Sequence, residues 1–181
     1  MRHLPNLICV LRIALVWPIV ASIAAGDYAR ALLLFFLAAA SDGLDGFLAK
    51  RFNWTSELGK VLDPAADKLL LIAVLLVSTW YGLIPHALTG IAVARDVLIG
   101  AGALIYHIGW GPLNGRPLLS SKINTLLQVL YVIAVVAHAG YGLPPARVLE
   151  VLAVMMLATV LISGYVYASV FTQRALAIGR A

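Results

Sequence analysis

Four aspartates, half of the chain's eight acidic residues, lie close together in the sequence: Asp42, Asp45, Asp63 and Asp67. Residues three or four apart share one face of a helix, so each pair would point to one side of its own helix. Two antiparallel helices joined between the pairs would bring the four carboxylates together. Ligands that are all oxygen favour hard divalent cations. The spacing therefore predicts a site for Mg²⁺ or Mn²⁺.

The composition around these aspartates is that of a membrane protein. Of 181 residues, 62% are hydrophobic and only 12% are charged, against about 25% in a typical soluble domain. An ionised Asp left unpaired in a bilayer costs ~2.5–3.5 kcal/mol, so such a cluster needs bound cations. The single Cys9 rules out an internal disulfide and a cysteine-based metal site. No basic stripe with interleaved aromatic residues is present, which argues against a nucleic-acid partner.

The elements that must position the aspartates are membrane-spanning helices, each needing about 20 mostly apolar residues. The first apolar run could be mistaken for a signal peptide, but Arg12 interrupts it and we expect it to be retained. The predicted fold is an all-α integral membrane protein in the lipid bilayer, with residues 1–181 forming a single domain. We expect six transmembrane helices, at about 5–25, 28–52, 62–83, 86–108, 118–141 and 146–172.

The basic residues predict the orientation, because cytoplasmic segments carry the excess of Lys and Arg. With a cytoplasmic N-terminus, the outer connections hold only Arg30 and Arg147. The inner segments then hold Arg2, Lys50, Arg51, Lys60, Arg116, Lys122, Arg174 and Arg180. We therefore expect both termini in the cytoplasm and the aspartates at the cytoplasmic leaflet, in what is predicted to be a bacterial inner membrane.

The glycines around the aspartates complete a longer pattern. It reads Asp42-x2-Asp45-Gly46-x2-Ala49-Lys50-x8-Gly59-x3-Asp63-x3-Asp67. This resembles the signature of the CDP-alcohol phosphatidyltransferase family, in which Arg usually stands at the Lys50 position. Lys keeps the positive charge but loses the bidentate phosphate geometry of Arg, although Arg51 follows directly. The resemblance covers most of the chain, since Pro5-Asn6 with Arg12 is similar to the family's first helix.

The resemblance implies roles for these residues. The four aspartates would hold two divalent cations, with Asp67 also acting as general base on the acceptor hydroxyl. The CDP part of the donor, CDP-diacylglycerol, would lie against Gly46, Ala49, Lys50 and Gly59. A Gly inside a helix costs about 1 kcal/mol relative to Ala, so the two glycines need a reason. Either close approach of the nucleotide or packing between helices would provide one. Lys50 and Arg51 could contact phosphate or anchor the helix end. A homodimer is also implied.

The second half of the chain bears on the acceptor. Arg95-Asp96-Val97 and the run from Ser121 to Gln128 resemble cardiolipin synthases of the CDP-diacylglycerol-dependent type, which implies phosphatidylglycerol as acceptor. The alternative is a phosphatidylglycerophosphate synthase acting on glycerol 3-phosphate; those enzymes more often carry a second Lys at the Asn124 position. Candidate contacts to the acceptor or its phosphate are Arg51, Arg95, Lys122 and Thr125.

Several intramembrane polar residues have a structural interpretation as well. Arg95 and Asp96 could form a salt bridge, Thr125 and Gln128 could make hydrogen bonds between helices, and Arg12 could pair with an acidic neighbour.

Two other classes of membrane protein also use acidic helices. Aromatic prenyltransferases need two distant Asp motifs and about nine spans, which this chain lacks. A divalent-cation transporter would carry acidic groups along a path across the membrane, whereas these are predicted at one leaflet. The pattern favours a phosphatidyltransferase that releases CMP.

Overall fold

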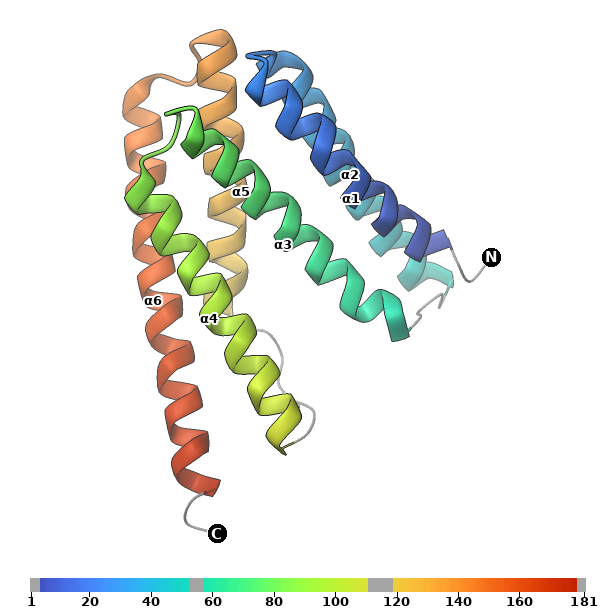
Figure 1. Ribbon diagram of the computed structural model, residues 1–181, viewed down its shortest axis with the longest axis vertical. Helices are drawn as coiled ribbons and strands as arrows, with labels where there is room; N and C mark the ends of the chain where they lie inside the picture. Colours follow the sequence, from blue (N-terminus) through green and yellow to red (C-terminus); the bar gives the residue numbers. More distant parts are fainter. Residues whose placement is uncertain (1–3, 53–56, 111–118, 179–181) are drawn as a thin grey trace. The chain divides into compact units, whose positions relative to one another are not determined.

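The computed structural model describes residues 4–52, 57–110 and 119–178, with side chains at 10–41, 66–105, 109 and 119–169. Within these residues the chain is helical apart from short connections (Figure 1). The helices are α1 (Leu4–Ala24), α2 (Tyr28–Phe52), α3 (Glu57–Trp80), α4 (His86–Trp110), α5 (Leu119–Tyr141) and α6 (Ala146–Ile178). Six helices were expected, and each observed helix overlaps the predicted span in the same position.

The bounds differ most for α3 and α6. The third span was expected at about 62–83, but α3 begins at Glu57 and ends at Trp80. The sixth was expected to end near 172, but α6 continues to Ile178. The expected bounds follow the long apolar runs of the sequence. Such a run stops where charged residues enter, although the helix itself continues. As a result, Gly59, Asp63 and Asp67 all lie on α3.

Glycines end α1 and α3 in the same way. Gly82 has a φ of +74°, a left-handed conformation that favours glycine. Its amide donates to the Thr79 carbonyl at 3.0 Å, and the Leu83 amide donates to the Ser78 carbonyl at 2.8 Å. This is the Schellman pattern, which satisfies the last carbonyls of a helix. Gly26, also at φ +74°, ends α1. These tight ends explain why α3 stops before the predicted residue.

The chain divides into two compact units, and each is described by itself. The first unit is Met1–Ile84 with Val132–Ala146, so it holds α1, α2, α3 and the last part of α5. In this unit α1 packs on both α2 and α3. Its buried apolar side chains recur three or four residues apart along each helix, as expected for helices packed along one stripe. They include Ile19, Ile23, Ala31, Phe35, Ala38, Leu71, Val74, Leu75, Val132 and Val136.

The second unit is Pro85–Tyr131 with Arg147–Ala181. It holds α4, the first part of α5 and α6. Apolar side chains such as Leu88, Met156 and Val160 are buried here, but so are polar ones, among them Arg95, Asn124 and Ser163. The division does not test the expectation that residues 1–181 act as a single domain, which stays a prediction.

Three of the helices contain stretches that are long and apolar enough for a bilayer. Among the described residues, three stretches could cross a membrane by length and composition: His86–Ile105, Leu119–Tyr141 and Ala146–Ser169. Two shorter apolar helical stretches are Val10–Ala24 and Tyr28–Ser41. Large apolar side chains such as Trp17, Leu98 and Tyr165 are exposed, which suits contact with lipid. The protein is therefore an integral membrane protein.

One glycine sets how closely two helices of the first unit approach. A Cβ added at Gly140 on α5 would lie 2.9 Å from the Cβ of Tyr28 at the start of α2. Because real Cβ atoms do not approach so closely, Gly140→Ala forces the two helices apart. We expect a loss of ~1–3 kcal/mol in the free energy of unfolding, seen as a lower midpoint of thermal unfolding in detergent.

Gly90 on α4 provides the matched control, because a Cβ added there meets nothing within 4 Å. Replacing a helical Gly by Ala without a clash favours the helix by up to about 1 kcal/mol. Gly90→Ala should therefore unfold at or above the wild-type midpoint. Equal midpoints for the two variants would contradict the close contact between α5 and α2.

Candidate functional site

The backbone places the four aspartates as two pairs on successive helices. Asp42 and Asp45 lie near the C-terminal end of α2, and Asp63 and Asp67 lie in the N-terminal half of α3. The spacings of three and four residues put each pair on one face of its helix. Only Asp67 has a described side chain; those of Asp42, Asp45 and Asp63 lie outside the described residues.

Asp67 is contacted by a buried arginine from the first helix. The Nη1 of Arg12 donates to the Oδ1 of Asp67, and the two side chains form an ion pair. Arg12 is only 1% exposed, whereas the Asp67 side chain is 45% exposed. The guanidinium thus contacts the carboxylate from the buried side, where α1 packs on α3. The other side of the Asp67 carboxylate stays accessible. Of the possibilities left open for Arg12, pairing with an acidic neighbour is the one that the structure forms.

This contact has a chemical consequence for Asp67. A charge-assisted hydrogen bond from a buried, tightly packed guanidinium restricts the carboxylate to one orientation. A general base must be held within hydrogen-bond reach of the proton that it takes. Arg12 is therefore placed to orient Asp67, and α1, through its packing on α3, positions the group predicted to act as general base.

The other residues of the signature are placed only by their helices. Gly46, Ala49, Lys50 and Arg51 lie on α2, and Gly59 lies on α3. Their side-chain surroundings lie outside the described residues. Their contacts with nucleotide or phosphate stay predictions.

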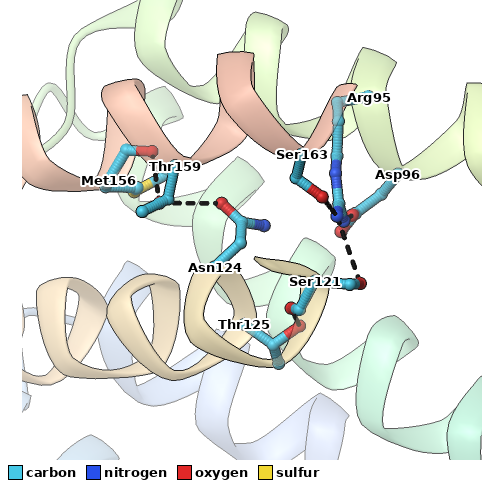
Figure 2. A network of polar contacts seen from close by, with 8 residues as sticks. All are labelled: Arg95, Asp96, Ser121, Asn124, Thr125, Met156, Thr159 and Ser163. Atoms are coloured by element: carbon cyan, nitrogen blue, oxygen red, sulfur yellow. Dashed lines mark hydrogen bonds and ion pairs between the residues drawn. The ribbon is translucent and has the colours of Figure 1, made fainter. Parts of the chain in front are cut away.

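A second polar cluster links the three helices of the second unit (Figure 2). The Nη1 of Arg95 on α4 lies 2.5 Å from Oδ1 of Asp96. Its Nη2 donates to the Oγ of Ser121 on α5, at 3.1 Å, and to the Oγ of Ser163 on α6. The guanidinium also lies 5.9 Å from the centre of the Tyr167 ring, within the range of a cation–π contact.

Arg95 and Asp96 therefore form the salt bridge that the sequence left open as one interpretation. Both side chains are 5% exposed. A buried ion pair needs additional hydrogen bonds to offset the loss of hydration, and the hydroxyls of Ser121 and Ser163 provide them here. The pair carries no net charge. A role of Arg95 in contacting the acceptor stays a prediction. Any such contact would be made by the Arg95–Asp96 ion pair and not by the guanidinium alone.

The remaining candidates lie along α5. Asn124 is fully buried, and its Oδ1 accepts a hydrogen bond from the Oγ1 of Thr159 on α6 at 3.2 Å. Thr125 donates to the backbone carbonyl of Ser121 at 3.1 Å, a bond within its own helix. Lys122 is exposed. Gln128 is fully buried, and within the described part of the chain neither its Oε1 nor its Nε2 has a hydrogen-bond partner.

Three contributors to this cluster were not predicted: Thr159, Ser163 and Tyr167. All three lie on α6, which reads as a plain apolar span. Hydroxyl residues in such a span often bond to their own helix, so their type alone does not mark them. The signal that could have found them is spacing, since Thr159 and Ser163 are four residues apart and share one face.

The donor set of the aspartates determines which metal could bind. Four carboxylates offer only oxygen, which suits Mg²⁺ or Mn²⁺ and disfavours softer metals. Among the side chains that the structure describes, no group of three or more His, Cys, Asp or Glu could hold a metal ion. Three of the four aspartates are not among those side chains. The accessible carboxylate of Asp67 fits a ligand of such a site.

The fold and the two polar clusters together define an integral membrane protein of helices, with paired carboxylates on α2 and α3 and a buried polar network linking α4, α5 and α6. A model of the CDP-alcohol phosphatidyltransferase family matches residues 2–169. The chain belongs to this family of enzymes.

Characterised relatives fall into two groups. The chain is 33% identical over 181 residues to the cardiolipin synthase (CMP-forming) of Homo sapiens, covering 91% of this chain and 60% of that protein. It is 31% identical over 154 residues to the CDP-diacylglycerol–glycerol-3-phosphate 3-phosphatidyltransferase of Bacillus subtilis, covering 76% and 78%. With the Streptomyces coelicolor cardiolipin synthase (CMP-forming) it shares 44% identity over 84 residues, covering 45% and 39%. The chain thus spans about 60% of the length of the human protein.

Proposed function

We propose that this protein is a phosphatidyltransferase of anionic phospholipid synthesis, which transfers the phosphatidyl group of CDP-diacylglycerol to a glycerol-type hydroxyl and releases CMP. The observation that carries the proposal is the family signature on α2 and α3, together with the Asp67 carboxylate that is accessible and held by buried Arg12. A hydrogen bond that fixes the orientation of the carboxylate helps to hold it within reach of the proton that a general base takes.

In the proposed reaction the acceptor hydroxyl gives its proton to the carboxylate of Asp67. Its oxygen forms a bond to the β-phosphorus of CDP-diacylglycerol, and the bond between that phosphorus and the oxygen of CMP breaks. Asp42, Asp45, Asp63 and Asp67 would hold two divalent cations, which when bound neutralise the pyrophosphate and the leaving group. Arg12 holds Asp67 throughout, because it is buried and contributed by a separate helix.

We propose phosphatidylglycerol as the acceptor, which would make the protein a cardiolipin synthase. The charge of the second cluster supports this acceptor. The charges of Arg95 and Asp96 cancel each other, and Asn124 is neutral. Glycerol 3-phosphate carries a phosphate monoester with close to two negative charges, whereas phosphatidylglycerol presents a diester with one. A buried cluster without net charge is better suited to the diester, because burying more charge without a partner is costly.

Glycerol 3-phosphate remains the second candidate acceptor, since the Bacillus subtilis relative bears that substrate in its name. The exposed Lys122 favours this alternative, because it supplies a cation beside the neutral cluster.

We further propose six spans with both termini in the cytoplasm, the aspartates at the cytoplasmic leaflet of a bacterial inner membrane, and a homodimer. The orientation rests on the distribution of basic residues, with only Arg30 and Arg147 on the outer side. The homodimer rests on the family alone.

An acceptor screen tests the function. The purified protein receives CDP-diacylglycerol and Mg²⁺ with phosphatidylglycerol, glycerol 3-phosphate, serine or inositol, and CMP and the lipid product are measured. We expect CMP release with phosphatidylglycerol, giving cardiolipin. A product formed only with glycerol 3-phosphate would select the second candidate. No CMP release with any of the four would contradict the proposed function.

A further inference from the structure

A groove lies between α4 and α6 in the second unit. It encloses about 550 Å³, and most of its wall is apolar, with Ile91 and Leu98 on α4 facing Val160 and Leu161 on α6. The lining positions run from 91 to 99 on α4 and from 160 to 168 on α6. At 1.5 Å per residue, each helix lines ~12 Å of groove. A channel of this length and polarity suits a hydrocarbon chain and not a small polar metabolite.

The groove owes its width to small residues. Ala94, Gly164 and Ala168 all line it. A Cβ added at Gly164 would meet only the Cγ of Arg95, at 3.8 Å, which is ordinary van der Waals contact. At Gly164 there is therefore room to begin a larger side chain without striking the backbone of the opposite helix. The space is therefore a property of these side chains and can be removed by substitution.

One charged residue lies in this apolar wall. Arg95 lines the groove, and its two terminal nitrogens are engaged by Asp96, Ser121 and Ser163. Its Nε is also buried, and among the described residues it has no hydrogen-bond partner. A buried donor without an acceptor is destabilising. Arg95 also contributes to the wall of the groove, so an oxygen held beside it there would supply the missing acceptor, which the apolar groove residues cannot provide.

We propose that this groove binds an acyl chain of the acceptor phospholipid, with a phosphodiester or ester oxygen of that lipid accepting a hydrogen bond from the Nε of Arg95. This inference rests on the proposed function. The apolar wall and the arginine beside it require an occupant with an apolar chain next to an oxygen acceptor, and a phospholipid has both. Glycerol 3-phosphate has no chain to fill the groove.

The acceptor lipid is a better occupant than the donor because of charge. The Arg95–Asp96 pair has no net charge, so it suits a monoanionic diester better than the more highly charged pyrophosphate of CDP-diacylglycerol. The groove thus gives the enzyme a means to select a lipid over a soluble acceptor.

Photo-crosslinking tests this site without requiring turnover. The wild-type protein in detergent is irradiated with phosphatidylglycerol that carries a diazirine in one acyl chain, and the labelled peptides are identified by mass spectrometry. We expect labels on α4 between 91 and 99 and on α6 between 160 and 168. Unlabelled phosphatidylglycerol should compete more strongly than CDP-diacylglycerol. Stronger competition by CDP-diacylglycerol would assign the groove to the donor and overturn the proposal.

Filling the groove supplies the second measurement. Gly164→Leu and, independently, Ala94→Leu should reduce crosslinking and raise the KM for phosphatidylglycerol by about tenfold or more. Each buried CH₂ contributes roughly fourfold to affinity, and either Leu displaces several of them. The KM for CDP-diacylglycerol should stay unchanged. Gly100→Leu is the matched control, because Gly100 lies on α4 outside the groove and a Cβ added there meets nothing within 4 Å.

The experiments distinguish a failure of the proposed acceptor from a failure of the groove inference. If the wild type crosslinks in the groove but makes no cardiolipin, the proposed acceptor is wrong, and with it the groove's role in catalysis. If the wild type makes cardiolipin but both filled variants crosslink and turn over as Gly100→Leu does, the groove inference is wrong and the function stands.

Discussion

We expect Asp67→Asn to reduce CMP release by ~10²–10⁴-fold, the usual contribution of a general base, and further if a metal ligand is lost with it. The substituted amide cannot accept a proton from the acceptor hydroxyl at neutral pH. Its Oδ1 can still accept the hydrogen bond that Arg12 donates to Asp67, so the packing of α1 on α3 should survive. The measurement is CMP release from CDP-diacylglycerol, with thermal unfolding measured on the same sample.

Asp27→Asn is a chemically matched control. Asp27 is exposed, and its Oδ1 caps α2 by accepting from the Arg30 amide at 3.0 Å. Asn and Asp cap helices about equally well, so this variant should keep wild-type stability and activity. Wild-type turnover by Asp67→Asn would show that another group takes the proton. A loss of folding in Asp67→Asn would instead show that Arg12 needs the negative charge and not only the oxygen atom.

The second large effect is expected at the ion pair of the second unit. Arg95→Met leaves the Asp96 carboxylate, 5% exposed, without this guanidinium. Breaking a buried ion pair from one side costs ~3–5 kcal/mol, so we expect a strongly lowered midpoint of thermal unfolding. Replacing both partners, as in Arg95→Met with Asp96→Leu, is often neutral or stabilising, and the double variant should regain most of the lost stability.

The double variant also separates structure from function. If it is stable but has lost activity with phosphatidylglycerol, Arg95 contributes to acceptor binding beyond its role in the fold. Lys122→Met is the control for removing a positive charge, because Lys122 is exposed on α5 and its loss should change stability by no more than ~0.5 kcal/mol. A single Arg95→Met variant as stable as the wild type would contradict the burial of the pair.

The helices could be predicted because bilayer thickness fixes the length of an apolar run, and Gly or Pro residues mark its ends. This is why α5, expected at about 118–141, is observed at Leu119–Tyr141. An apolar run does not mark the end of a helix that continues past its apolar part. Glu57 and Lys60 interrupt the apolar run but not α3, so the start predicted from hydrophobicity lies too late in the chain.

The site was predictable to the extent that its residues are close in sequence. Asp63 and Asp67 share a face of α3 by spacing alone. The partner of Arg12 was not predictable in the same way, because Asp67 is 55 residues further along the chain and several acidic residues were possible. Ser163 was missed for a similar reason, since it is 68 residues from the Arg95 that it bonds to. Such contacts follow from helix packing, which sequence spacing does not encode.

The pairing of Arg12 with Asp67 also bears on how the chain enters the membrane during synthesis. Arg12 is made 55 residues before the carboxylate that it contacts, and an Arg at the centre of a lone spanning helix opposes insertion by ~2.5–3.5 kcal/mol. The contact with Asp67 on α3 can offset this cost only after the third helix has been made. We infer that α1 to α3 leave the translocon as one group, so that the helices assemble and the carboxylate predicted to act as general base gains its partner in the same event.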